Sequence, residues 1–160
     1  MRIMLKFAID VDADAAWHAL HSPAVLSEIY GPLITLEHLS PDDSPETAHP
    51  SYAVQMRLFG VIPLGRQLIA LSDSIRDDRI GTVRIVRDSG IPLTGPLSSL
   101  DVWDHQMAVS PVPGDRRRTL WRDRLVIAGP LTPVLWPMLW VVWQWRQRRI
   151  RRIAPSWAGD

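Results

Sequence analysis

The strongest constraint on this chain is an uncharged stretch near its C-terminus, which follows a long region of strand-like sequence. Residues 125–145 contain no charged side chain and hold four of the eight tryptophans, Trp136, Trp140, Trp143 and Trp145. Arginines follow directly, as Arg146, Arg148, Arg149, Arg151 and Arg152. A surface helix has a single apolar stripe. A helix that is apolar on several sides must be buried, cover a cavity, meet a partner or touch lipid.

Composition narrows the class of protein. A chain of 160 residues is expected to form one domain with a sizeable core. The formal net charge of +1 argues against a general nucleic-acid binder. Cysteine is absent, which excludes disulfides and thiol chemistry and is compatible with a reducing compartment. The first six residues alternate instead of forming a continuous apolar segment, so we expect no signal peptide and a cytoplasmic protein, with membrane association left open.

Hydrophobic periodicity predicts one strand, two short helices, about six further strands and one long helix. Residues 2–11 alternate with period two, as a half-buried strand does. Asp12 or Asp14 can cap a short helix, and Pro23 suits the first turn of a second. Further strands are expected over residues 33–40, 51–59, 66–75, 82–87, 100–109 and 119–127. The long helix is expected over residues 134–153, with a kink or a late start at Pro137.

This order of elements favours an α+β fold. Strands that follow one another in sequence favour antiparallel pairing. We therefore expect a bent antiparallel β-sheet of about six to seven strands wrapped around the long C-terminal helix, with two short helices after the first strand. The domain is expected to span residues 1–154, and residues 155–160 are expected to form a C-terminal tail.

Two local patterns sharpen this expectation. Ala16-Trp17 followed by Ser22-Pro23 is similar to the opening helix pair of the START-like (SRPBCC) superfamily. Trp103-Asp104-His105 followed by Thr119-Leu120-Trp121-Arg122-Asp123 is similar to two strands of its ligand-binding members. Together with the element order, the chain resembles this superfamily over residues 2–153. The resemblance implies a helix-grip fold with a cavity for lipids, sterols, polyketides or other apolar molecules. Some members are cyclases, aromatases or hydrolases, and fold alone does not choose among these functions.

The hairpin over residues 100–127 suggests a polar pair. One register pairs Trp103 with Leu125, His105 with Asp123, Met107 with Trp121 and Val109 with Thr119. Directly opposed side chains are close enough for His105 and Asp123 to form a hydrogen bond. The pair would serve as a polar handle for a ligand, as a general base, or as a structural pair that satisfies itself. No third catalytic group stands at a recognisable spacing, which favours the structural role.

Other candidate sites are weaker. His18 and His21 have a spacing that metal ligands use, but no third ligand is evident. Asp10 and Asp12 straddle a strand end and a helix cap, while Asp42 and Asp43 fall in a polar loop. The glycines form no phosphate-binding fingerprint, and Gly-x-Ser-x-Gly is absent. We therefore expect neither a metal nor a cofactor.

The last helix has several interpretations. As a cavity lid it would direct five apolar residues inward, Leu135, Met138, Leu139, Val142 and Trp145. It would then direct a second stripe outward, Trp136, Trp140 and Trp143. An exposed apolar stripe usually marks an interface, which here would be a homodimer or a membrane surface with the arginines near anionic lipid. A transmembrane span is the remaining alternative, but the strand takes residues 125–127 and leaves too short a segment.

We conclude that the sequence predicts one domain that binds or carries a small hydrophobic ligand, such as a lipid, isoprenoid or polyketide-like molecule. The ligand is expected to contact Trp103, His105, Met107, Trp121, Asp123, Leu135, Met138, Leu139 and Val142. Two alternatives remain open. One is a cyclase-, aromatase- or hydrolase-like enzyme that uses His105 and Asp123. The other is a module that docks on a membrane or partner through the tryptophan-rich helix.

Overall fold

The computed structural model describes residues 1–39, 51–78 and 81–159. Its elements in chain order are β1 (Arg2–Ile9), α1 (Ala13–Leu20), α2 (Pro23–Tyr30), β2 (Ile34–His38), β3 (Ser51–Leu58), β4 (Ile62–Asp78), β5 (Gly81–Asp88), η2 (Pro96–Ser99), β6 (Val102–Val112), β7 (Asp115–Ala128), α3 (Thr132–Ile153) and η3 (Ala154–Gly159). The expected loop with Asp42 and Asp43 lies outside the described residues.

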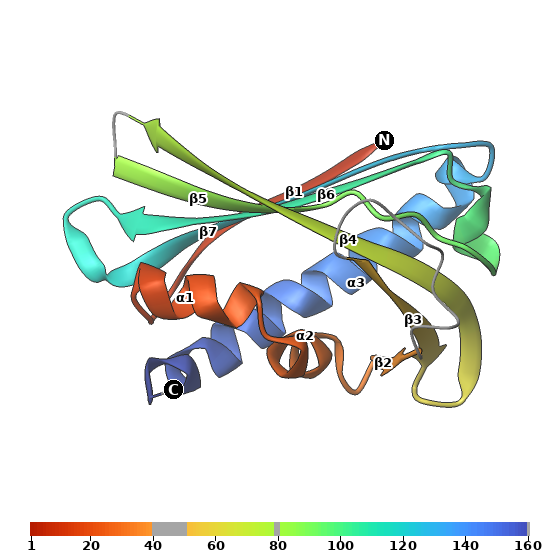
Figure 1. Ribbon diagram of the computed structural model, residues 1–160, viewed down its shortest axis with the longest axis horizontal. Coiled ribbons are helices and arrows are strands. Elements are labelled where there is room, and N and C mark those ends of the chain that lie inside the picture. The colour runs from red at the N-terminus through yellow and green to blue at the C-terminus, as the bar shows by residue number, and fades with distance from the viewer. Residues whose placement is uncertain (40–50, 79–80, 160) are drawn as a thin grey trace.

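The seven strands form one antiparallel sheet in the order β1-β7-β6-β5-β4-β3-β2. The long strand β4 curves, so that β3 and β2 lie on the same side of the sheet as the helices (Figure 1). Helix α3 runs along this side and contacts β1 and α2. The predicted α+β fold, with two short helices after the first strand and one long helix last, is confirmed.

The helix starts follow local sequence signals. The Asp12 carboxylate accepts hydrogen bonds from the backbone N–H groups of Asp14 and Ala15, both at 2.9 Å, and so caps α1. Pro23 occupies the first turn of α2, where its missing N–H costs no hydrogen bond. Helix α3 begins at Thr132 and continues through Pro137, so the expected late start is not observed.

The register of the β6–β7 hairpin differs from the predicted one by two residues. His105 lies opposite Leu125, Met107 opposite Asp123, and Trp103 opposite Ile127. The turn is tight, with Val112 opposite Asp115. Next to the turn the register shifts between Val112 and Pro111, which lies opposite Thr119. A slip of two residues keeps each side chain on its own face of the sheet, because strand side chains alternate with period two. The predicted face is therefore right although the predicted partners are wrong.

The core divides into two clusters along α3. The packed cluster includes Phe7, Ile9, Ala16, Val86, Val109, Trp121, Ile150 and Trp157. The hollow cluster includes Ile34, Val54, Met56, Ile69, Trp103, Leu135, Leu139, Val142 and Trp143. Trp157 packs on Trp121 with ring centroids 6.1 Å apart. Ala154 and Trp157 of η3 therefore belong to the packed cluster.

Candidate functional site

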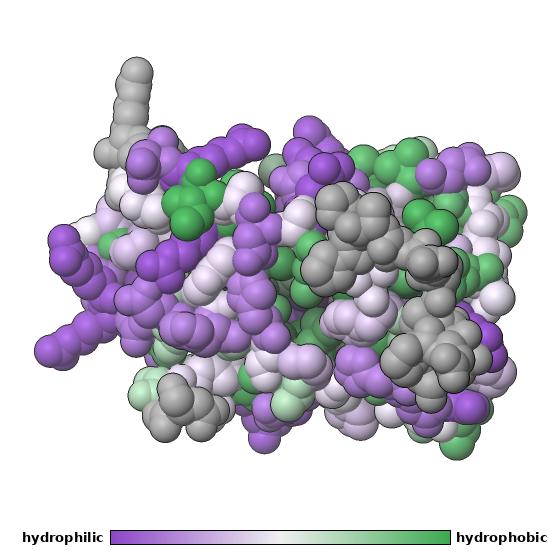
Figure 2. Space-filling view, viewed as in Figure 1, coloured by the Kyte–Doolittle hydropathy of each residue, from purple (hydrophilic) through white to green (hydrophobic). Residues whose placement is uncertain are grey.

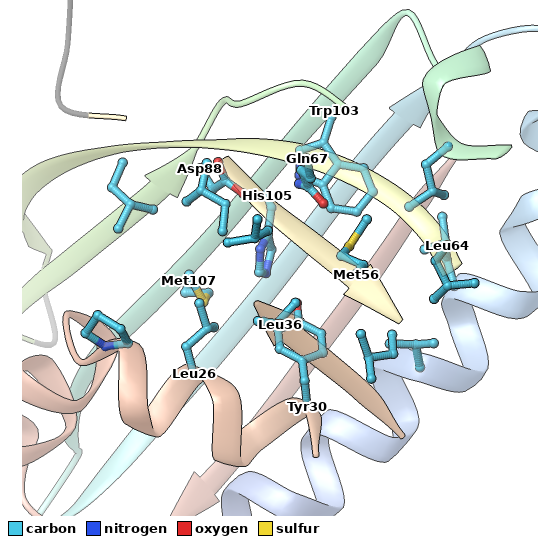
Figure 3. Close-up of a pocket in the computed structure, with 18 of the residues that line it drawn as sticks. Leu26, Tyr30, Leu36, Met56, Leu64, Gln67, Asp88, Trp103, His105 and Met107 are labelled. Carbon is cyan, nitrogen blue, oxygen red and sulfur yellow. The ribbon is translucent and has the colours of Figure 1, made fainter. Parts of the chain in front are cut away.

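A cavity of about 160 Å³ lies between the sheet and the helices, within the hollow cluster. Its walls come from α2, α3 and strands β2 to β6, and they are mostly aliphatic. Leu26 lines it from α2, while Leu36, Met56 and Leu64 line it from β2, β3 and β4 (Figure 3). The curvature of β4 brings β2 and β3 round toward α2 (Figure 1), and the cavity lies between these elements.

The few polar side chains of the cavity wall lie mainly on the sheet. Gln67, Asp88, Trp103 and His105 project toward the cavity from the neighbouring strands β4, β5 and β6 (Figure 3). Among the described residues, the Trp103 Nε1 and the Gln67 side-chain amide have no hydrogen-bond partner. Buried polar groups are normally paired, so these atoms are available to a bound molecule or to water.

Behind this wall lies the fully buried carboxylate of Asp123. Its Oδ1 accepts hydrogen bonds from His105 Nε2 at 2.9 Å and from Trp143 Nε1 at 2.7 Å. Its Oδ2 lies 3.3 Å from Arg146 Nη2. Burial acts to raise the pKa of the Asp123 carboxyl, but the charges of Arg146 and His105 and these hydrogen bonds outweigh it, so the pKa falls to about 2. Asp123 is therefore a carboxylate at neutral pH.

Arg146 is 0% exposed and connects α3 to three other elements. Its Nη1 donates to the Tyr30 hydroxyl at 2.9 Å, and its guanidinium carbon lies 4.8 Å from the centre of the Tyr30 ring. Burial acts to lower the pKa of Arg146, but Tyr30 and Asp123 outweigh it and raise that pKa. The pKa of Tyr30 is raised, chiefly by burial. These groups form a charged network that is closed to solvent.

The network orients the imidazole of His105. The Asp123 carboxylate, which can only accept, lies 2.9 Å from Nε2 and is its nearer partner, whereas Arg146 Nη1, which can only donate, lies 3.3 Å from the same nitrogen. We therefore assign the proton of a neutral His105 to Nε2. Among the described residues nothing bonds to Nδ1, and His105 lines the cavity. Nδ1 is then a hydrogen-bond acceptor available to a ligand.

Asp88 is a second buried carboxylate in the cavity wall, and it lies directly opposite His105 in the β5–β6 ladder. Its Oδ1 accepts from the backbone N–H groups of Ala70 at 3.1 Å and Gly90 at 3.0 Å. Within the described part of the chain, no group donates to its Oδ2 and no cation pairs with it. The charge of Asp88 helps to raise the pKa of Tyr52, after the larger effect of burial.

The predicted site residues divide into two groups. The cavity is lined by Trp103, His105, Met107, Met138, Leu139 and Val142. The other three do not line it. Trp121 belongs to the packed cluster, Asp123 lies behind His105, and Leu135 is buried in the hollow cluster. His105 and Asp123 do share one face and a hydrogen bond, as predicted, although they form a diagonal pair and not an opposed one.

The outward stripe predicted for α3 is wrong at Trp143. This side chain is 1% exposed and donates its indole N–H to Asp123. Trp140 is exposed, as predicted, and Trp136 is half-buried. Trp145 is half-buried and does not line the cavity. The three tryptophans share a helical spacing, but the curved sheet covers a wider part of the helix than one stripe and takes in Trp143.

Arg146 was grouped by sequence with the surface arginines, and its role was missed. Its position carries a signal, since Arg146 follows Leu139 by seven residues and Val142 by four, on the buried face of the helix. Tyr30 occupies the last position of α2, and the sequence gives no comparable signal for Gln67 or Asp88.

The remaining candidates have structural roles. His21 bonds through Nε2 to Asp73 at 3.0 Å and through Nδ1 to the Trp17 carbonyl at 2.9 Å. Asp10 accepts a hydrogen bond from Arg118 at 2.8 Å. The described residues contain no cluster of three or more side chains suited to a metal ion.

Comparison with known proteins supports the fold. No family model and no curated protein sequence matches this chain. Solved structures do match. A protein from Mesorhizobium loti has a TM-score of 0.63 and 11% identity, over 100% of this chain and 99% of its own. Norcoclaurine synthase from Thalictrum flavum, solved with dopamine and hydroxybenzaldehyde, has a TM-score of 0.61 and 12% identity, over 98% and 87%.

The Aha1 dimer from Colwellia psychrerythraea gives a TM-score of 0.60 and 12% identity, over 96% of this chain and 95% of its own. At such identities the likeness shows the fold alone, and it is consistent with a helix-grip fold. As for a bilayer span, no helix in the described residues combines the length and the apolarity that a crossing requires.

Proposed function

We propose that the protein binds a small apolar ligand in the cavity between the sheet and α3, as a START-like ligand-binding domain would. The observation that carries this proposal is the cavity itself, an apolar enclosure with a few convergent polar groups that lack partners. A protein that needed the space only for its core would fill it, because interiors are close-packed.

The volume of the cavity limits the size of the ligand. A cavity of about 150 Å³ holds a molecule the size of benzene. The cavity here has about 160 Å³, so it suits one ring with a short substituent, or the head of a longer molecule that extends through an opening. This argues for a ring-sized ligand over a whole sterol or a two-chain lipid. Norcoclaurine synthase, which shares the fold, was solved with two small aromatic molecules.

Cavity filling provides the test. Met56→Trp places a larger side chain in the cavity, and Met4→Trp makes the same change at an exposed position of β1. We expect toluene to shift the amide resonances of cavity residues in the unchanged protein and in Met4→Trp, but not in Met56→Trp. Native mass spectrometry of the purified protein should show a co-purifying small molecule that Met56→Trp lacks. Equal binding of toluene to all three proteins would exclude the cavity as the site.

A second candidate function, docking on an anionic membrane surface, is supported by the outer side of α3. Five apolar residues are exposed at its start, Leu131, Val134, Met138, Trp140 and Val141. The exposed arginines near its end are Arg148, Arg151 and Arg152, and the helix contains no acidic residue. Hydrophobic residues also reach the surface at the right-hand end of the molecule in Figure 2, where α3 begins in Figure 1.

The charge pattern selects the membrane over a second copy of the chain. A symmetric dimer through α3 would offer no acid from either helix to balance the arginines. Anionic headgroups would balance them, while apolar side chains enter the headgroup region. We expect vesicles with anionic lipid to bind the protein and neutral vesicles to bind it weakly. Val134→Gln with Trp140→Gln should abolish co-sedimentation, whereas Val61→Gln with Ile75→Gln, two exposed positions elsewhere, should preserve it.

If both pairs of substitutions leave co-sedimentation unchanged, the outer side of α3 is not the docking surface. A loss of binding accompanied by a shift from dimer to monomer in solution would instead assign the patch to a second copy.

A further inference from the structure

Within the part of the chain that the structure describes, one buried carboxylate in the cavity wall has no side-chain cation as its partner. The buried ionisable groups there are Asp88, Asp123, His105 and Arg146. Arg146 is an ion-pair partner of Asp123, with Nη2 and Oδ2 3.3 Å apart. Asp88 has no cation partner among the described residues, and only two backbone N–H groups bond to it. The cavity wall therefore holds a carboxylate that no arginine or lysine side chain among the described residues compensates.

This charge lies where a ligand can reach it. Asp88 and His105 occupy opposite positions of adjacent strands, at which side chains on one face stand about 4.5–5.5 Å apart at Cβ. Both line the cavity, and Figure 3 shows them side by side on its sheet wall. The free Asp88 Oδ2 and the free His105 Nδ1 are both acceptors in the assigned tautomer. Two neighbouring acceptors, one of them charged, form a receptor for a cationic donor.

We infer that the ligand is a small apolar primary amine, whose ammonium group is bound by Asp88 Oδ2 and His105 Nδ1 and whose apolar body fills the rest of the cavity. This inference rests on the proposed function, because it names the head group of the molecule that the cavity binds. An ammonium ion has three donors and no acceptor, so it matches both sites at once. Hydrogen bonds between charged partners are the strong ones in a site shielded from water.

A carboxylate ligand fits this wall less well. Trp103 Nε1 and the Gln67 amide could donate to it. It would nevertheless enter a small space that already holds the unpaired charge of Asp88, and like charges in such a space repel. An amine ligand and a carboxylate ligand therefore predict opposite results: in the first case the cavity prefers cationic test compounds, and in the second it prefers anionic ones.

A matched series of ring compounds separates these possibilities. Toluene, benzylamine, benzyl alcohol and benzoate share one ring and differ in the head group. We expect benzylamine to bind at least about tenfold more tightly than benzoate and benzyl alcohol, measured by titration with amide and indole resonances as readout. Binding of toluene tests the cavity alone. If toluene binds and benzoate binds as well as or better than benzylamine, the amine proposal is overturned and the cavity function stands. If none of the four binds, both proposals fail.

Substitution of Asp88 tests whether this side chain binds the ammonium group. Asp88→Asn keeps the size of the side chain and an oxygen for the two backbone donors but removes the charge. We expect it to weaken benzylamine binding about tenfold or more and to leave toluene binding unchanged. Asp101→Asn removes one negative charge from an exposed position and should change neither. Should Asp88→Asn fail to fold, the four-compound series on the unchanged protein still decides. Unaltered benzylamine affinity in a folded Asp88→Asn would exclude Asp88 as the receptor.

Discussion

The two clusters of the core use the same helix and the same sheet, yet one is solid and the other hollow. At the C-terminal end of α3, α1 and η3 close the packed cluster, and Trp121 is completely buried against Phe7 and Trp157. At the other end, β2, β3 and α2 surround the hollow cluster but leave a cavity of about 160 Å³. A curved sheet cannot follow a straight helix along its whole length. Large aromatic side chains fill the gap at one end, and the gap stays open at the other.

The buried network lies at the boundary between the clusters. Arg146 precedes Ile150 of the packed cluster by one helical turn and follows Val142 of the hollow cluster by one turn. It holds Tyr30, Asp123 and, through Asp123, His105. Arg146 and Asp123 therefore position two side chains of the cavity wall, Tyr30 and His105, without lining the cavity themselves. We therefore expect the network to matter more for the shape of the hollow cluster than for the packed cluster.

The largest effect should come from breaking the network. Arg146→Ala removes the arginine partner of the buried Asp123 carboxylate and leaves only the bonds from His105 and Trp143. Loss of one partner of a buried ion pair costs about 3–5 kcal/mol in the free energy of unfolding. Urea denaturation measures this cost. Arg148→Ala, an exposed arginine on the same helix, is the control and should change stability by less than about 0.5 kcal/mol. A small effect at Arg146 would mean that the two clusters are held together without the network.

A pair of isoleucines tests the contrast between solid and hollow directly. Ile9→Ala opens a void in the packed cluster and should cost about 2–5 kcal/mol. Ile69→Ala removes a side chain that already borders the cavity, so fewer contacts are lost and the cost should be roughly half as large. Thermal or urea unfolding of both variants gives the comparison. Equal costs would show that the cavity closes around Ile69 in solution.

The smallest expected effect is the change in the free energy of unfolding at acidic pH. The pKa of Asp123 is lowered from 3.8 to about 2, so its charged form is favoured by folding. That contribution is fully present above about pH 4 and is lost as the pH falls through 2. The stability difference between the unchanged protein and Asp123→Asn should therefore shrink between pH 4 and pH 2.

Asp104 provides the matched comparison for this prediction. Its pKa is also lowered, since the bonds from Arg87, Gln106 and Arg124 outweigh the effect of partial burial, but its carboxylate lies on the outer side of β6 and reaches solvent. Asp104→Asn should show a weaker pH dependence than Asp123→Asn, because solvent screens surface pairs. A stronger pH dependence in Asp104→Asn than in Asp123→Asn would show that the surface carboxylate contributes more to acid sensitivity than the buried one.

Much of the architecture follows from local signals. Alternation defines β1, β3, β6 and β7, the Asp12 cap and Pro23 start the short helices, and the uncharged C-terminal stretch becomes the long helix. The shared face of His105 and Asp123 follows from alternation as well, and it survives the wrong register because a slip of two residues preserves the face.

Local sequence therefore shows which residues alternate, which form turns, and which are too apolar to stay in water. The remaining features follow from contacts made in the folded chain. The spacing of Trp136, Trp140 and Trp143 does not reveal how much of the helix a curved sheet covers, and Arg146 among five arginines does not reveal that it alone pairs with Asp123. Asp88 gains its role from its position opposite His105, which strand pairing sets. Burial and charge balance depend on neighbours distant in the sequence, so they exist only once the chain has folded.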